Sequence, residues 1–335
     1  MNALLRLERN WVMPLMRVAL IAWLLVTRFF EAPGRLAASL HKRPIEVLDA
    51  PHLEALLHPL GLWPMPAGFV DAIGPVLWIG SVCALLGIAT RLSLVATAFA
   101  FFVCNAVGSG WGFFNHTPAL PEQVLIALAL LPGTTGFSVD RWLLLQWRRR
   151  RGDRSPWIDT VCPLVPRFGE VFVFVVVGLF YAASGIAKVR LGLGGWLSGE
   201  TLQWYLAGGA AKHQYWYGPA GGDTISGYLY VGQATPLGLL LSSSQAITAV
   251  LSWTTLLAEL GALVFLLMGG WWRVGWIAVA IVFHIVVRIT LGPGFSDWIL
   301  IDVVLGMPLL ITLLDDRKKR RHAALLPTTT AASAA

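Results

Sequence analysis

The sequence predicts an all-α integral membrane protein, a polytopic bundle of about eight transmembrane helices. Of its 335 residues, 56% are hydrophobic and 13% are charged, whereas a soluble domain carries roughly 25% charged residues. Several apolar runs reach or approach the ~20 residues that an α-helix needs to cross a bilayer. These two observations exclude a soluble α/β fold.

The apolar runs define the expected spans, which cover residues 11–30, 70–89, 92–108, 121–132, 168–188, 246–268, 274–291 and 296–314. The fourth is short and begins at Pro121, a residue suited to the first turn of a helix. We expect residues 1–322 to form one transmembrane domain and residues 323–335 to form a flexible tail.

Two long segments connect the spans. Segment 141–167 is basic and contains four consecutive arginines at 148–151. Segment 189–245 is rich in Gly, Trp and Tyr, and we expect it to hold interfacial or re-entrant pieces at 199–206 and 236–241. Irregular backbone at membrane depth is tolerated only where protein or water satisfies it.

The charges predict the orientation. With eight spans and both termini in the cytoplasm, the inner side receives segment 141–167, Arg273 and the basic run at 317–321. Positive residues are enriched in cytoplasmic loops, so this orientation is the favoured one. We expect a multi-pass protein of a bacterial-type inner (cytoplasmic) membrane. The net charge of +7 then follows from topology and does not indicate nucleic-acid binding. The three cysteines lack metal-ligand spacing, and we expect no metal.

The span at 168–188 ends in Lys188, and a charged side chain inside a bilayer costs at least ~2.5–3.5 kcal/mol. Tyr181, Ser184 and Lys188 follow at three- and four-residue steps, so they share one helix face. Gly178 and Gly185 lie close to that face and allow a neighbouring helix or a flat ligand to approach. A lysine partly taken out of water releases its proton more readily and can act as a base. The alternative interpretation is a snorkelling lysine that anchors the helix end.

Other polar residues are candidates for the same chemistry. His116 lies in the outer turn between spans three and four, where an imidazole can relay a proton. His284 and Arg288 are four residues apart and share a face of their span. Glu259 is an intramembrane carboxylate that needs a partner, and we expect Glu259 and Arg288 to support the fold. Asp302 is a weaker candidate.

The start of the last span carries Asp297, which we interpret as a helix cap. Just after Lys188, three glycines at 192, 194 and 195 predict that the helix breaks near the membrane surface and continues along it.

Three stretches together resemble the horizontally transferred transmembrane (HTTM) family, whose best-known members are vitamin K-dependent gamma-carboxylases. They are GLFYAASGIAKVR followed by GWLSGETLQWYL, NHTPALPEQVLIALALLPGTTGFSVDRWL, and FHIVVRITLGPGFSDWILIDVVL. They occur in the order of the family and cover most of residues 100 to 305.

The resemblance implies a function. Lys188 matches the lysine that deprotonates vitamin K hydroquinone in the carboxylase, His116 the turn histidine that assists it, and His284 a later intramembrane histidine. It implies an enzyme at the outer leaflet with epoxidation- or carboxylation-like chemistry, a reduced lipid quinone as cofactor, and membrane lipid and a protein or peptide substrate as partners. Four residues are the expected contacts of the quinone: Tyr181, Ser184, Gly185 and Trp196.

Two other functions stay open. Short members of the family include a toxin-maturation protein, so a non-catalytic maturation, immunity or assembly protein is the second interpretation. A small-solute transporter with Glu259, His284 and Arg288 as its path is the third interpretation. The sequence shows no internal repeats, which many transporters have. It also has no Walker loop or HExxH motif, which argues against an NTP-driven pump or a zinc protease.

Overall fold

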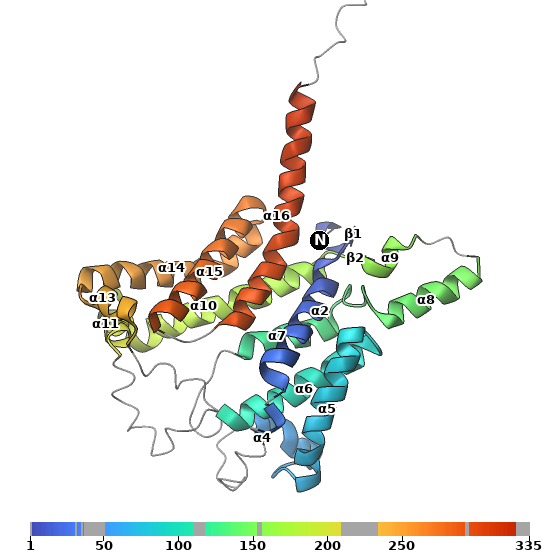
Figure 1. Cartoon of the computed structure of the whole chain (residues 1–335), viewed down its shortest axis with the longest axis horizontal. Coiled ribbons are helices and arrows are strands. Elements are labelled where there is room, and N and C mark those ends of the chain that lie inside the picture. Colours follow the sequence, from blue (N-terminus) through green and yellow to red (C-terminus); the bar gives the residue numbers. More distant parts are fainter. Residues whose placement is uncertain are drawn as a thin grey trace, which may run out of the picture.

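The computed structural model describes residues 2–30, 32–34, 36, 51–109, 118–152, 156–208, 234–291 and 295–325. It is a bundle of helices with one short two-stranded ribbon (Figure 1). This confirms the predicted all-α polytopic membrane fold.

The N-terminal half contains α1 (Asn2–Leu5), β1 (Leu7–Arg9), α2 (Val12–Leu24) with its continuation η1 (Leu25–Phe29), α4 (Pro51–Leu57), η3 (His58–Leu60), α5 (Ala67–Leu86), α6 (Thr90–Ser109) and α7 (Ala119–Leu130). After it come α8 (Val139–Arg150), α9 (Ile158–Val161), β2 (Leu164–Pro166), α10 (Phe168–Leu197), α11 (Glu200–Leu206), α13 (Pro236–Ser242), α14 (Gln245–Met268), α15 (Gly270–Leu291) and α16 (Ser296–Leu325).

Six of the described helices are long and apolar enough to cross a membrane. They cover Val12–Phe29, Ala67–Leu86, Thr90–Val107, Phe168–Arg190, Gln245–Met268 and Gly270–Leu291. The other two predicted spans coincide with α7, a shorter apolar helix, and with the first part of α16. The chain is therefore a multi-pass membrane protein.

The surface of α14 shows how these helices face lipid. Val250, Leu257 and Val264 recur every seven residues and are 58–65% exposed. The opposite side of the same helix buries Ser252 and Glu259. Apolar side chains point outward and polar ones inward, as expected when the surrounding medium is hydrocarbon.

Arg17 of α2 binds the end of α5 and the connection between α7 and α8. Its side chain is fully buried in α2. The guanidinium donates to Leu85 O at 2.9 Å at the end of α5, and to Thr134 O at 3.1 Å and Phe137 O at 2.8 Å in the α7–α8 connection. Guanidinium has five donors, so one residue can satisfy carbonyls from several segments.

Asp140 of α8 caps the start of α6. Its carboxylate accepts hydrogen bonds from the backbone N–H of Ala89 at 2.9 Å and from the N–H and hydroxyl of Thr90 at 2.7 and 2.8 Å. Burial raises the pKa of Asp140, but these hydrogen bonds and nearby Arg17 lower it more, so the pKa lies below its usual value. The ionised form of Asp140 therefore stabilises this turn.

Segment 141–167, expected as a loop, contains regular structure. Ser138 caps the start of α8 by accepting a hydrogen bond from the backbone N–H of Arg141 at 3.0 Å, and the helix extends to Arg150, within the arginine run. Strand β2 pairs antiparallel with β1, with Leu7 opposite Pro166. The ribbon places the N-terminus beside the basic segment, and Figure 1 shows the end of α16 on the side away from α4, α11 and α13.

The described part of segment 189–245 contains helices at the expected places. Helix α10 leaves helical geometry at Gly192 (φ −164°, ψ 36°) and resumes to Leu197. Helices α11 and α13 lie where interfacial pieces were predicted, and residues 209–233 lie outside the described part of the chain. At the other end α16 reaches Leu325, into the predicted tail, whose remaining residues also lie outside it.

Candidate functional site

Two glycines let α10 and α14 approach closely. A Cβ on Gly178 would lie 2.9 Å from the Cα of Leu263, and one on Gly185 would lie 3.0 Å from Leu260 and 3.2 Å from the Cβ of Glu259. Real Cβ atoms do not fit at the shorter of these distances. The space beside Gly185, expected to admit a helix or a flat ligand, is therefore occupied by α14. Contact of Gly185 with a quinone stays a prediction.

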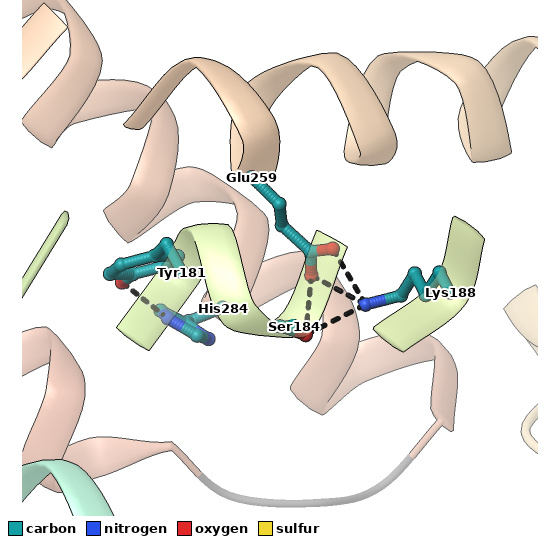
Figure 2. Close-up of polar contacts among 5 residues, drawn as sticks. All are labelled: Tyr181, Ser184, Lys188, Glu259 and His284. Carbon is teal, nitrogen blue, oxygen red and sulfur yellow. Dashed lines mark hydrogen bonds and ion pairs between the residues drawn. The ribbon is translucent and has the colours of Figure 1, made fainter. Parts of the chain in front are cut away.

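The close approach brings Lys188 of α10 to Glu259 of α14. The Lys188 ammonium lies 2.7 Å from both carboxylate oxygens of Glu259 and donates to the Ser184 hydroxyl at 2.9 Å. Ser184 in turn donates to Oε1 of Glu259 at 3.1 Å. Figure 2 shows the three side chains closing a triangle between the two helices. We call these three residues the lysine cluster.

The lysine cluster lies at the boundary of the packed interior. The Lys188 side chain is 17% exposed and that of Glu259 is 6% exposed, so only the lysine is within reach of the surroundings. The ring of Trp196, beyond the Gly192 kink, lies with its centroid 5.2 Å from the Lys188 nitrogen. An ammonium within about 6 Å of an indole is attracted to it. The Trp196 ring, four residues after the kink, therefore lies beside the Lys188 ammonium.

One turn before Ser184, Tyr181 makes a second set of buried contacts. Its hydroxyl lies 2.7 Å from Nε2 of His284 on α15 and 2.8 Å from Oδ2 of Asp302 on α16. The three residues are at most 3% exposed. We call these three residues the tyrosine cluster; Figure 2 shows Tyr181 and His284.

Aromatic rings surround the tyrosine cluster. The Tyr181 ring meets Trp276 and Trp298 edge-on, at centroid distances of 4.7 and 5.2 Å. The His284 ring stacks on Phe295 at 4.8 Å. Edge-to-face and stacked arrangements are the favoured geometries of ring pairs. These rings pack around the buried cluster.

The two clusters are neighbours within one group of helices. Tyr181 and Glu259 both line a small apolar cleft between α10, α14 and α15, with a volume of about 10 Å³. That is about the room that one water molecule requires. The cleft is much too small for a quinone ring.

Asp297 does more than begin α16. Its fully buried carboxylate accepts a hydrogen bond from the indole of Trp23 at 2.8 Å and pairs with Arg28. On α7, buried Glu122 accepts a hydrogen bond from Asn105 of α6. These contacts give each of the two buried carboxylates a partner on another helix, and neither involves the lysine cluster.

The structure thus brings together Lys188, Ser184 and Glu259, and separately Tyr181 and His284. His116 lies outside the described residues. Glu259, which was expected to support the fold rather than the reaction, forms an ion pair with Lys188, and its role in the fold stays a prediction. Asp302, the weaker candidate of the sequence analysis, contacts the Tyr181 hydroxyl; a carboxylate within an apolar helix is a signal that the sequence carries.

Comparisons of the chain with protein-family models, with curated proteins and with solved structures gave no match.

Proposed function

We propose that the chain is a membrane enzyme resembling the HTTM family, in which Lys188 removes a proton from an acidic hydroxyl such as that of a reduced lipid quinone. The observation that carries the proposal is the lysine cluster. It places one partly exposed amine against one buried carboxylate among apolar helices. Intramembrane ionisable residues are functional candidates by default.

The contact between Lys188 and Glu259 provides a way to free the amine. The ion pair and its neutral form differ by one proton moved along the 2.7 Å contact from the nitrogen to the carboxylate. Separated charges are poorly stabilised in a low-dielectric interior, so the neutral pair lies closer in energy there than in water. In the neutral pair Lys188 is an amine that can accept a substrate proton, and the Glu259 carboxyl holds the proton it received.

The surroundings of Lys188 fit a ring that bears a hydroxyl. The partly exposed Lys188 amine lies over the Trp196 ring, 5.2 Å from its centroid, and aromatic rings pack favourably against one another. A reduced quinone would supply an acidic hydroxyl and an oxidisable ring. Reaction at the outer leaflet of a bacterial-type inner membrane, with both termini cytoplasmic, belongs to the same proposal and rests on the charge distribution.

Lipid mass spectrometry tests the proposal. Purified protein in lipid nanodiscs is incubated with vitamin K hydroquinone, oxygen and bicarbonate, and the quinone epoxide is measured. We expect the wild type to form epoxide and Lys188→Arg to form no more than empty nanodiscs, because arginine pairs with Glu259 but cannot give up its proton. Arg190→Lys, an exposed position on the same helix, is the matched control and should stay active.

Two results would overturn the assignment. Absence of epoxide with the wild type would refute the quinol as substrate. Full activity of Lys188→Arg would remove Lys188 as the base.

A non-catalytic maturation or assembly protein is the second candidate. The observation in its favour is that Lys188, Ser184 and Glu259 bind one another between two closely packed helices. Such a cluster can simply tie α10 to α14. In that case Lys188→Arg preserves whatever partner binding the wild type has, because both side chains can bind a carboxylate.

A further inference from the structure

In the tyrosine cluster, the phenol oxygen of Tyr181 lies between the carboxyl group of Asp302 and the imidazole of His284. The Tyr181 hydroxyl is within hydrogen-bond distance of both Asp302 and His284. A phenol has one proton to donate and lone pairs with which to accept. It therefore donates to only one of the two neighbours at a time, and the other neighbour must donate to it.

Two arrangements satisfy this condition while the cluster holds the same number of protons. In the first, Oδ2–H of Asp302 donates to Tyr181, and Tyr181 donates to Nε2 of His284. In the second, Nε2–H of His284 donates to Tyr181, and Tyr181 donates to the Asp302 carboxylate. Conversion of the first into the second breaks the O–H bond of Asp302 and forms an N–H bond on His284. Tyr181 gives up one proton and gains another, so no oxidant or reductant is required.

The burial of the cluster favours this transfer over exchange with solvent. Asp302 is 0% exposed and His284 is 2% exposed, and the surrounding rings close the site. Oδ1 of Asp302 has no hydrogen-bond partner among the described residues. A buried carboxylate with one bare oxygen is poorly stabilised, so Asp302 is a good place to hold a proton.

Several charged groups on the neighbouring helices have partners outside the tyrosine cluster. On α15, Arg273 donates to Leu266 O at 2.6 Å. On α14, Glu259 is paired with Lys188. On α2 and η1, Arg17 is bound by backbone carbonyls and Arg28 by Asp297. On α7, Glu122 is bound by Asn105. The hydrogen bonds of Tyr181 link Asp302 to His284, so these are the titratable groups between which a proton is passed.

We propose that Asp302, Tyr181 and His284 form a proton-transfer wire, a second ionisable site beside the lysine cluster, in which the Tyr181 hydroxyl passes one proton between Asp302 and His284. Because Tyr181 and Glu259 line the same cleft, movement of charge along the wire offsets a change of charge on the lysine cluster. This role rests on the proposed function, whereas the wire itself does not.

Infrared difference spectroscopy tests the wire without any substrate. The protein in nanodiscs carries ¹³C-labelled aspartate and ¹⁵N-labelled histidine, and its spectrum is followed through a pH titration. We expect a carboxylic-acid band, absent in Asp302→Asn, that changes with the same midpoint as an imidazolium band. Tyr181→Phe removes the link but keeps the ring. Its two midpoints should separate by about tenfold in proton concentration, because coupled sites titrate as one unit only while they interact.

Tyr205→Phe, at a 37% exposed position of α11, is the matched control and should leave the shared midpoint unchanged. The wire is refuted if Tyr181→Phe keeps one shared midpoint, or if Asp302→Asn loses no titrating band. If Asp302→Asn does not fold, the Tyr181→Phe comparison decides alone. Since no quinol is present, failure here is distinct from failure of the proposed function.

Discussion

Replacing Lys188 with methionine should destabilise the protein more than replacing Glu259 with glutamine. Lys188→Met keeps the apolar stem but leaves the Glu259 carboxylate, 6% exposed, without its cation. A buried charge that loses its partner costs about 3–5 kcal/mol. Glu259→Gln leaves the ammonium of Lys188, which is 17% exposed and still has Ser184 and Trp196 beside it. Because Glu259→Gln loses only the charge-assisted hydrogen bonds, we expect its free energy of unfolding to fall by about 1.5–3 kcal/mol.

The double variant Lys188→Met with Glu259→Gln gives the coupling energy. It removes both charges, so neither is left uncompensated, and its loss of stability should fall short of the sum of the single losses by about 1–3 kcal/mol. Reversible unfolding in mixed micelles with increasing dodecyl sulfate, followed by tryptophan fluorescence, provides the free energies. Arg190→Met, on the exposed side of α10, is the control and should change stability little. Additive single losses would refute the pairing of Lys188 with Glu259.

Three further predictions concern the fold. In a cysteine-free background, a membrane-impermeant thiol reagent added outside should label cysteine at position 243 and not at position 152; labelling at 152 would overturn the orientation. Asp140→Asn should lower stability at neutral pH by about 0.5–1 kcal/mol, after allowance for solvent screening of this partly exposed cap. The folded-state pKa of Asp140 is depressed. The extra stability of the wild type over Asp140→Asn should therefore be full above the unfolded-state pKa of Asp140 and vanish as the pH falls through its folded-state pKa. Chemical denaturation of both proteins at several pH values measures this difference in stability, and a pH-independent difference would contradict the prediction. Gly178→Val should cost about 1–3 kcal/mol through overpacking against α14, measured by thermal unfolding, while an unchanged melting temperature would show that the helices are not in contact at this glycine.

The sequence by itself determined the fold class of the protein, the positions of its helices and the residues that share a face within one helix. Apolar length and low charge predict spans because a bilayer requires about 20 apolar residues whatever the neighbours are. The common face of Tyr181, Ser184 and Lys188 follows from the 3.6-residue period alone. The break near Gly192 and the helices at 200–206 and 236–242 were likewise predictable, because glycine and proline act locally.

Only the tertiary structure decided which polar groups meet. Glu259 and Arg288 belong to spans that are adjacent in sequence, yet Glu259 binds Lys188, 71 residues away. Asp302 meets Tyr181 across 121 residues, and Asp297 binds Arg28 across 269. Periodicity defines a face within one helix, but the rotation and depth of that helix against another depend on packing. Here the glycines of α10 allow the close approach to α14, and that approach selects Glu259 as the partner of Lys188.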